Sequence, residues 1–219
     1  MSSGLVIFDC DGVLVDSERL GVDIDVRAIT TLGWPITRDE VISRFLGRSE
    51  ADAIAEIEAY LGHPVAADFA EQWEADYRQA FAKSLEAVPG VDAAIAAVRE
   101  AGHAVCVASS GGHGKIRRNL GLTGLAHHFG EHIFSAADVP NGKPAPDLFL
   151  HAASSMGFVP NRCVVVEDSQ HGVAGAKAAG MRVVGFAGGI TPRPLLAGAD
   201  AIIEDMVLLP RTIAGLGSA

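Results

Sequence analysis

Four acidic residues follow directly on two short apolar runs and are the first candidates for chemistry. Asp9 and Asp11 come after LVIF (5–8), and Glu167 and Asp168 come after CVVV (163–166). Side chains two residues apart in an extended segment project to the same side. If the two runs are neighbouring strands, several carboxylates converge on one point, which is tolerable only around a cation. A site made of oxygen ligands suits magnesium.

A hydroxyl and an ammonium group accompany these acids. Ser109 follows the run AVCVA (104–108), and Lys143 lies in the loop segment NGKPAPD (141–147). Together with magnesium they would neutralise a dianionic phosphoryl group. Asp9 can then act as the nucleophile and form an aspartyl phosphate. Asp11 can protonate the leaving oxygen and afterwards accept a proton from the attacking water.

Each of these residues also has an ordinary interpretation. Acidic pairs after strands are often solvated or cap a helix, and Asp168 with Ser169 could simply begin the next helix. A single lysine such as Lys143 normally lies at the surface. The segment SSGGHGK (109–115) is not a P-loop, because Ile116 follows its lysine and its glycine spacing is wrong.

Alternation of short apolar runs with helical patterns predicts the elements that position these residues. It indicates an α/β fold, a doubly wound parallel sheet with a Rossmann-like core. Parallel strands of this kind point their carboxyl ends at the ligand crevice. Strands are expected at 5–8, 104–108, 163–166 and 182–186, with a further one at 132–135, and helices at 91–102, 114–121, 146–157 and 171–180.

The stretch from about residue 15 to 85 shows helical periodicity and no convincing strand. Two capping boxes, TRDE (37–40) and SEAD (49–52), are expected to begin helices within it. The aromatic residues Phe69, Trp73, Tyr77 and Phe81 repeat every four residues, a spacing more typical of core than of a ligand site. We therefore expect a small α-helical cap domain at 15–85, inserted into a catalytic core of 1–14 and 86–219.

Composition restricts the class of protein. The chain has 219 residues with a net charge of −10, so neither nucleic acid nor an anionic membrane is an expected partner. No run is long enough to span a bilayer, and the amino terminus does not have the pattern of a secretion signal. The three cysteines lie in or beside apolar runs, which is typical of reduced, buried thiols in a cytoplasmic protein. A monomer is expected.

Four segments together carry a family resemblance. In order, DCDGV (9–13), Ser109 after its strand, GKPAPD (142–147) and VVVEDSQHGVAGAKAAGM (164–181) resemble the motifs of the haloacid dehalogenase superfamily. Four motifs in the same order and spacing are far more specific than a single DxD. The resemblance implies Asp9 as nucleophile, Asp11 as acid and base, and Ser109 and Lys143 as phosphate-binding residues. It also implies magnesium held by Asp9, the main-chain carbonyl of Asp11, Asp168 and Glu167.

The same resemblance suggests substrate-binding residues. The helical insertion resembles a cap that closes over the substrate. Arg48, in the cap segment FLGRSE (45–50), is expected to contact the distal part of the substrate. Ser110, beside Ser109, and His113, which aligns with a phosphate-side position of the related sugar phosphomutases, are further candidates.

Three functions fit these residues. The favoured one is a magnesium-dependent phosphatase that hydrolyses a small phosphorylated metabolite such as a sugar phosphate. The second is a sugar phosphomutase resembling beta-phosphoglucomutase; Leu20 stands where that mutase carries a histidine, which favours hydrolysis. The third is a non-catalytic phosphoacceptor module resembling response-regulator receivers, for which this chain is about twice as long as needed.

Overall fold

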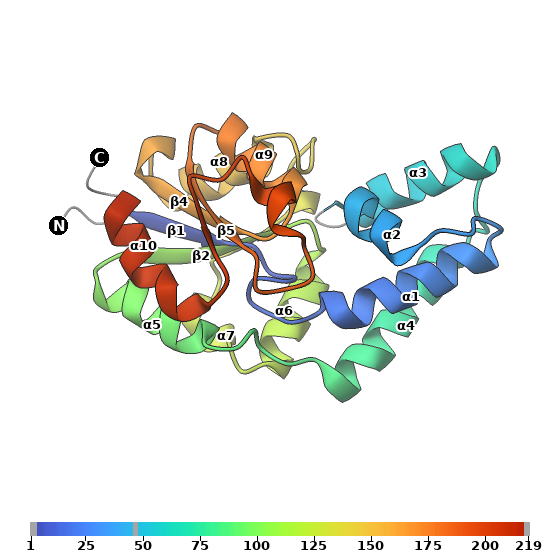
Figure 1. Ribbon diagram of the computed structural model, residues 1–219, viewed down its shortest axis with the longest axis horizontal. Coiled ribbons are helices and arrows are strands. Elements are labelled where there is room, and N and C mark those ends of the chain that lie inside the picture. The colour runs from blue at the N-terminus through green and yellow to red at the C-terminus, as the bar shows by residue number, and fades with distance from the viewer. Residues whose placement is uncertain (1–3, 46–47, 217–219) are drawn as a thin grey trace.

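The computed structural model describes residues 4–45 and 48–216, and its core is a six-stranded parallel sheet (Figure 1). The strand order is β3-β2-β1-β4-β5-β6, the doubly wound order in which the direction of strand succession reverses between β1 and β4. The expected fold class is thus confirmed. The strands are β1 (Leu5–Phe8), β2 (Ala104–Ser109), β3 (Ile133–Ser135), β4 (Cys163–Glu167), β5 (Arg182–Phe186) and β6 (Ala201–Ile203).

Helices cover both faces of the sheet (Figure 1). Successive side chains of β1 point to opposite faces, so Val6 and Phe8 pack with α5, α6, α7 and α10, while Leu5 and Ile7 pack with α8 and α9. Burial on both faces explains why the central strands are uninterrupted apolar runs. These helices are α5 (Val91–Glu100), α6 (His113–Leu122), α7 (Ala126–Phe129), α8 (Asp147–Ser155), α9 (Gln170–Ala178) and α10 (Leu209–Leu216).

The first five strands were predictable, but β6 was not, because its three residues form too short a run to be distinguished from a loop. In the described part of the chain, short 3-10 helices complete the core at Ala136–Asp138, Pro160–Arg162, Arg193–Leu196 and Met206–Leu208. All three cysteines are buried and free, as expected. No helix among residues 4–45 and 48–216 is long and apolar enough to cross a membrane.

The expected helical insertion lies between β1 and β2 as α1 (Glu18–Thr31), α2 (Arg38–Phe45), α3 (Glu50–Leu61) and α4 (Phe69–Ser84). It projects from one end of the sheet and has its own apolar cluster, in which Ile29, Trp34 and Ile57 are buried (Figure 1). Both linkers to the core run side by side: Val88 N–H donates to Leu14 O at 3.0 Å and Asp16 N–H donates to Glu86 O at 2.9 Å. The linkers are residues 9–17, between β1 and α1, and residues 85–90, between α4 and α5.

Local signals in the insertion have the structural roles expected of them. Thr37 and Glu40 cap each other reciprocally, with Thr37 N–H donating to Glu40 Oε2 at 2.9 Å and Glu40 N–H donating to Thr37 Oγ1 at 3.3 Å. Ser49 caps α3 by accepting the Asp52 N–H at 3.2 Å. The aromatic residues of α4 pack in the core clusters, although Trp73, Tyr77 and Phe81 also line the cavity described below.

Candidate active site

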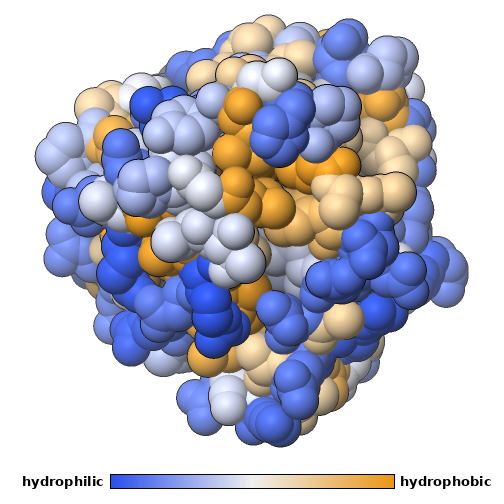
Figure 2. All heavy atoms as spheres, turned by 90° about the vertical axis from the view of Figure 1, so that its right-hand side faces the viewer, coloured by the Kyte–Doolittle hydropathy of each residue, from blue (hydrophilic) through white to orange (hydrophobic). Residues whose placement is uncertain are grey.

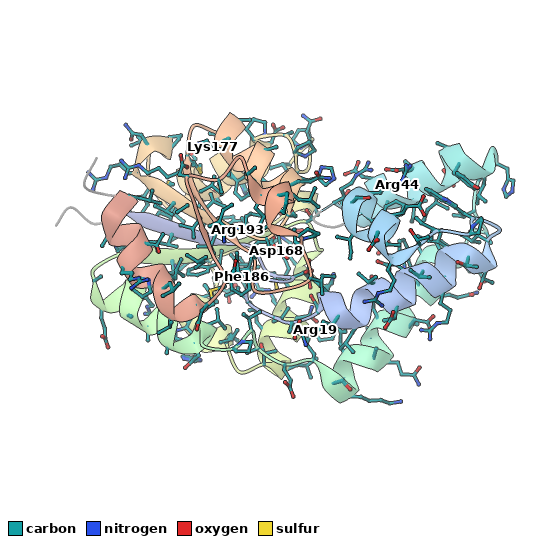
Figure 3. The ribbon with its side chains drawn as sticks, viewed as in Figure 1. Arg19, Arg44, Asp168, Lys177, Phe186 and Arg193 are labelled. Carbon is teal, nitrogen blue, oxygen red and sulfur yellow. The ribbon has the colours of Figure 1, made fainter. Side chains whose placement is uncertain are left out.

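The acidic residues meet at the carboxyl edge of the sheet, where the strand order reverses. Strands β1 and β4 are parallel neighbours with Phe8 opposite Val166, and Asp9 N–H continues the ladder by donating to Val166 O at 3.0 Å. This pairing brings oxygens of Asp9, Glu167 and Asp168 within 4.8 Å of one another. Figure 3 labels Asp168 in the part of the core that faces the inserted helices.

Lys143 is the buried cation of this cluster. Its side chain is fully buried, and Nζ donates to Asp9 Oδ1 at 2.5 Å, Glu167 Oε1 at 2.6 Å and the main-chain oxygen of Ala108 at 3.2 Å. Burial disfavours the ammonium, but the two carboxylates outweigh this effect and raise the pKa of Lys143 above its ordinary value. Loss of solvent raises the pKa of Asp9 to about 7, against the attraction of Lys143. The surface interpretation of Lys143 is therefore wrong.

Glu167 is held by several donors at once. Its Oε2 accepts from the main-chain N–H and the hydroxyl of Ser169, each at 3.0 Å, while Oε1 accepts from Lys143. A Cβ at position 172 would overlap the Glu167 carboxylate, so glycine is required there. Ser169, not Asp168, caps α9, because its hydroxyl accepts the Gly172 N–H at 3.0 Å. Asp168 is left with a buried oxygen, Oδ2, that has no hydrogen-bond partner among the described residues.

The Asp11 side chain has hydrogen-bond donors of its own, which Asp9, Glu167 and Asp168 do not share. Its Oδ1 accepts from the Ser17 hydroxyl at 2.8 Å and its Oδ2 accepts from Lys115 Nζ at 2.9 Å. Burial alone would raise the pKa of Asp11, but Lys115 and these hydrogen bonds lower it below its usual value. A side chain engaged in this way fits an acid and base, and leaves only the main chain of Asp11 for a metal.

The oxygen donors fit magnesium. The group comprises three buried carboxylates, and one of them, Asp168, has an oxygen, Oδ2, without a hydrogen-bond partner among the described residues. Hard oxygen ligands without nitrogen or sulfur are the set that magnesium prefers. Glu167 accepts three hydrogen bonds from protein donors, so Asp9 and Asp168 have more oxygen lone pairs left to bind a metal.

A cavity of about 470 Å³ opens between the core and the inserted helices. Asp9, Asp11, Ser109 and Ser110 line its core side, together with Lys115 from α6. Ser109 is buried, and its Oγ accepts the Gly111 N–H at 3.1 Å. Figure 2 views the molecule from the end that carries the inserted helices, where apolar side chains gather in the middle of a mostly hydrophilic face.

Of the two remaining candidate substrate-binding residues, Arg48 lines the cavity and His113 does not. Arg48 lines the cavity, with its guanidinium paired to Glu56 and also donating to Asp52 O at 3.4 Å. Gly47, which precedes it in the sequence, is outside the described residues. His113 is not among the residues that line the cavity; its Nε2 contacts Asp138 Oδ1 at 2.8 Å.

Three residues of the site were missed from the sequence. Ser17 and Glu18 follow the first motif within VDSE (15–18), and their closeness to it was the available signal. Lys115 was considered only as a P-loop lysine, and nothing in the sequence connects it to Asp11, 104 residues away.

Comparison with known proteins adds to this geometry. Residues 6–186 match the model of a family described as haloacid dehalogenase-like hydrolase. The 6-phosphogluconate phosphatase of Escherichia coli K12 is 32% identical over 192 residues, which cover 87% of this chain and 86% of that protein. Beta-phosphoglucomutase of Bacillus subtilis 168 is 28% identical over 208 residues, covering 91% and 88%. A solved haloacid dehalogenase-like protein from Agrobacterium tumefaciens C58 is 35% identical, with a TM-score of 0.82 and coverage of 99% and 100%.

Proposed function

Since the chain belongs to the haloacid dehalogenase-like hydrolase family, we propose that it is a magnesium-dependent phosphatase that hydrolyses a small phosphorylated metabolite through an aspartyl phosphate on Asp9. One observation carries the proposal: Asp9 lies at the floor of the cavity, bonded to the buried Lys143 and two residues from an acid that faces the same cavity. Family membership argues against the phosphoacceptor module, because the match is to a family of enzymes.

The protein's own groups divide the reaction between them. Lys143 fixes the Asp9 carboxylate by bonding Oδ1, and its charge compensates the phosphoryl group that Asp9 would receive. Ser109 and Ser110 line the cavity beside Asp9, where hydroxyls can donate to phosphoryl oxygens. Asp11 would protonate the leaving oxygen in the first step and take a proton from water in the second.

Magnesium would be held by Asp9, Asp168 and the main-chain carbonyl of Asp11, with Glu167 behind them. When bound, it supplies positive charge that neutralises the phosphoryl oxygens. The donor set supports this assignment, because these oxygens are buried and one of them has no protein partner among the described residues.

The far wall of the cavity supports a polyhydroxyl substrate such as a sugar phosphate. It carries groups of both charges from the core and the insertion, which offer donors and acceptors to hydroxyls. These are Asp25, Arg48, Glu50, Glu74 and Arg118. The relative named 6-phosphogluconate phosphatase supports the same substrate class. Helices α1 to α4 would serve as the cap that excludes water. We also propose that the protein acts as a monomer in the cytoplasm.

A sugar phosphomutase is the second candidate, since one relative is named beta-phosphoglucomutase. A mutase must pass the phosphoryl group back to a sugar and avoid water. Leu20, expected at the mutase histidine position, packs on the core apolar cluster, and the next residue, Gly21, lines the cavity without a side chain that could move a proton. This arrangement favours hydrolysis.

The decisive experiment incubates the protein and magnesium with p-nitrophenyl phosphate and a panel of sugar phosphates, sugar acid phosphates, polyol phosphates and phosphoglycolate. We expect steady release of inorganic phosphate over many turnovers. Isomerisation of a sugar phosphate without phosphate release would establish the mutase. A single stoichiometric burst without turnover would overturn both enzymatic functions.

A further inference from the structure

Glu18 is a buried acid that the proposed reaction does not use. It is the first residue of α1 and only 6% exposed, and its Oε2 has no hydrogen-bond partner among the described residues. Its carboxyl group lies next to that of Asp168 beside Gly12, and Asp168 Oδ2 is also buried and without a partner among the described residues. When both groups are ionised, they repel each other and neither can donate a hydrogen bond, so the pair is unfavourable in that state.

Gly12 shows how tightly the two acids converge. Its φ is +79°, and a Cβ there would overlap Asp168 Oδ2 and lie 2.7 Å from Glu18 Cδ. Both carboxyl groups therefore pack against the same α-carbon, directly after the residues that begin the first motif. Glu18 and Asp168 therefore occupy the same small space beside Gly12.

The local charges are unbalanced. Five buried or partly buried carboxylates lie around this space, from Asp9, Asp11, Glu18, Glu167 and Asp168. Lys143 pairs with Asp9 and Glu167, and Lys115 pairs with Asp11. Within residues 4–45 and 48–216, no lysine, arginine or histidine forms an ion pair with Glu18 or Asp168. A divalent cation at Asp168 would supply the missing positive charge.

We propose that Glu18 is a positioning residue of the metal site, whose carboxylate stands behind Asp168, draws the cation in by its charge and holds Asp168 in the orientation that binds it. This inference depends on the proposed function in one respect, that the site binds a metal, and does not depend on the reaction. Its ordinary alternative is an acid at the first turn of α1 that stabilises the helix dipole and has no effect on the metal.

Ser17, next to Glu18, links the start of α1 to Asp11, the proposed acid and base. Ser17 is buried, and its hydroxyl donates to Asp11 Oδ1 at 2.8 Å. The first turn of α1 thus contacts Asp11 through one residue and Asp168 through the next. Glu18 therefore connects the insertion to the metal site while Ser17 connects it to the proton-transferring group.

The test measures metal binding directly, by calorimetry with Mg²⁺ and by electron paramagnetic resonance with Mn²⁺, on wild type, Glu18→Gln and the exposed control Glu86→Gln. We expect Glu18→Gln to weaken metal binding by roughly 10- to 100-fold, as losses behind metal ligands do. Without metal the same variant should melt at a higher temperature than wild type, because its amide can donate to Asp168 Oδ2. Glu86→Gln, with the same change in charge, should alter neither property.

The outcomes separate this inference from the proposed function. Unchanged metal affinity in Glu18→Gln, or equal weakening in Glu86→Gln, would overturn the role of Glu18, as would a wild type that binds neither ion. Wild-type metal binding without phosphate release would overturn the phosphatase and leave the role of Glu18 standing. If Glu18→Gln does not fold, Glu18→Asp, which keeps the charge but shortens its reach, should bind metal more weakly than wild type, and wild-type affinity in that variant would overturn the role.

Discussion

The ammonium of Lys143 lies 2.5 Å from Oδ1 of Asp9, although the two residues are 134 positions apart in the chain. Lys143 also bonds Glu167 at 2.6 Å, so one buried cation joins the loop after β3 to the ends of β1 and β4. The pair belongs both to the proposed chemistry and to the fold, because the Lys143 side chain is fully buried while the Asp9 side chain, 7% exposed, lines the cavity.

Replacement of the nucleophile is the most direct test of the mechanism. Asp9→Asn should leave a folded protein without measurable turnover, because an amide of nearly the same size cannot attack phosphorus. Phosphate release is the assay for turnover, and circular dichroism reports folding. A wild-type rate in this variant would contradict an aspartyl phosphate on Asp9.

Loss of the buried cation should destabilise the protein. Lys143→Met leaves the carboxylates of Asp9 and Glu167 buried without their partner, which costs roughly 3 to 5 kcal/mol. Urea denaturation without metal measures the free energy of unfolding. The control is Lys177→Met, which removes an exposed lysine paired with Asp200 and should cost less than about 1 kcal/mol. Similar losses in the two variants would show that Lys143 is not the central charge of the core.

Chelation should abolish activity reversibly. Excess EDTA should stop phosphate release, and magnesium added beyond the chelator should restore it. Calcium should inhibit, because its larger and looser coordination shell spoils the alignment of the reacting groups. Full turnover in excess EDTA would mean that the acidic cluster does not hold a required metal. A large loss of stability in Asp168→Ala without metal would indicate a structural role for that residue instead.

Arg48 should determine substrate preference. Arg48→Ala should lower kcat/KM for the best sugar phosphate by roughly 10- to 100-fold, the effect of one charge-assisted contact, and should change p-nitrophenyl phosphate hydrolysis much less. Arg44→Ala is a matched control, since Arg44 bonds the same Glu56 carboxylate at 3.0 Å but does not line the cavity. Equal losses on both substrates would place Arg48 in the fold or in the core site.

Asp25 should make the stability of the protein depend on pH. Burial raises the pKa of Asp25 from 3.8 to about 6, although Tyr77 and Trp73 donate to its Oδ1. Because the folded-state pKa is raised, the stability linked to the protonated acid is fully present below pH 4 and is lost as the pH rises through about 6. An asparagine keeps an acceptor but does not titrate. The stability of Asp25→Asn relative to wild type should therefore grow by roughly 1 to 3 kcal/mol between pH 4 and pH 7, measured in urea. A constant difference would show that Asp25 is ionised throughout.

The class of fold and the identity of the acids can be predicted from the order of residues alone. Uninterrupted apolar runs such as CVVV indicate strands buried on both faces, and glycines and capping residues mark where the helices between them begin and end. Asp9, Asp11 and Asp168 could be selected because a carboxylate directly after a buried strand lies at the edge where parallel strands open. Each of these signals lies within a few consecutive residues, so it can be recognised without knowing the fold.

Which distant groups meet depends on how the elements pack in three dimensions. The pairing of β1 with β4 places Asp168 beside Asp9, the packing of α6 brings Lys115 to Asp11, and the start of α1 brings Glu18 to Asp168. The packing also turns His113 toward Asp138. Contacts of this kind depend on how elements far apart in the chain pack together, and the short-range periodicity that defines a helix or strand carries no record of the partner it will contact.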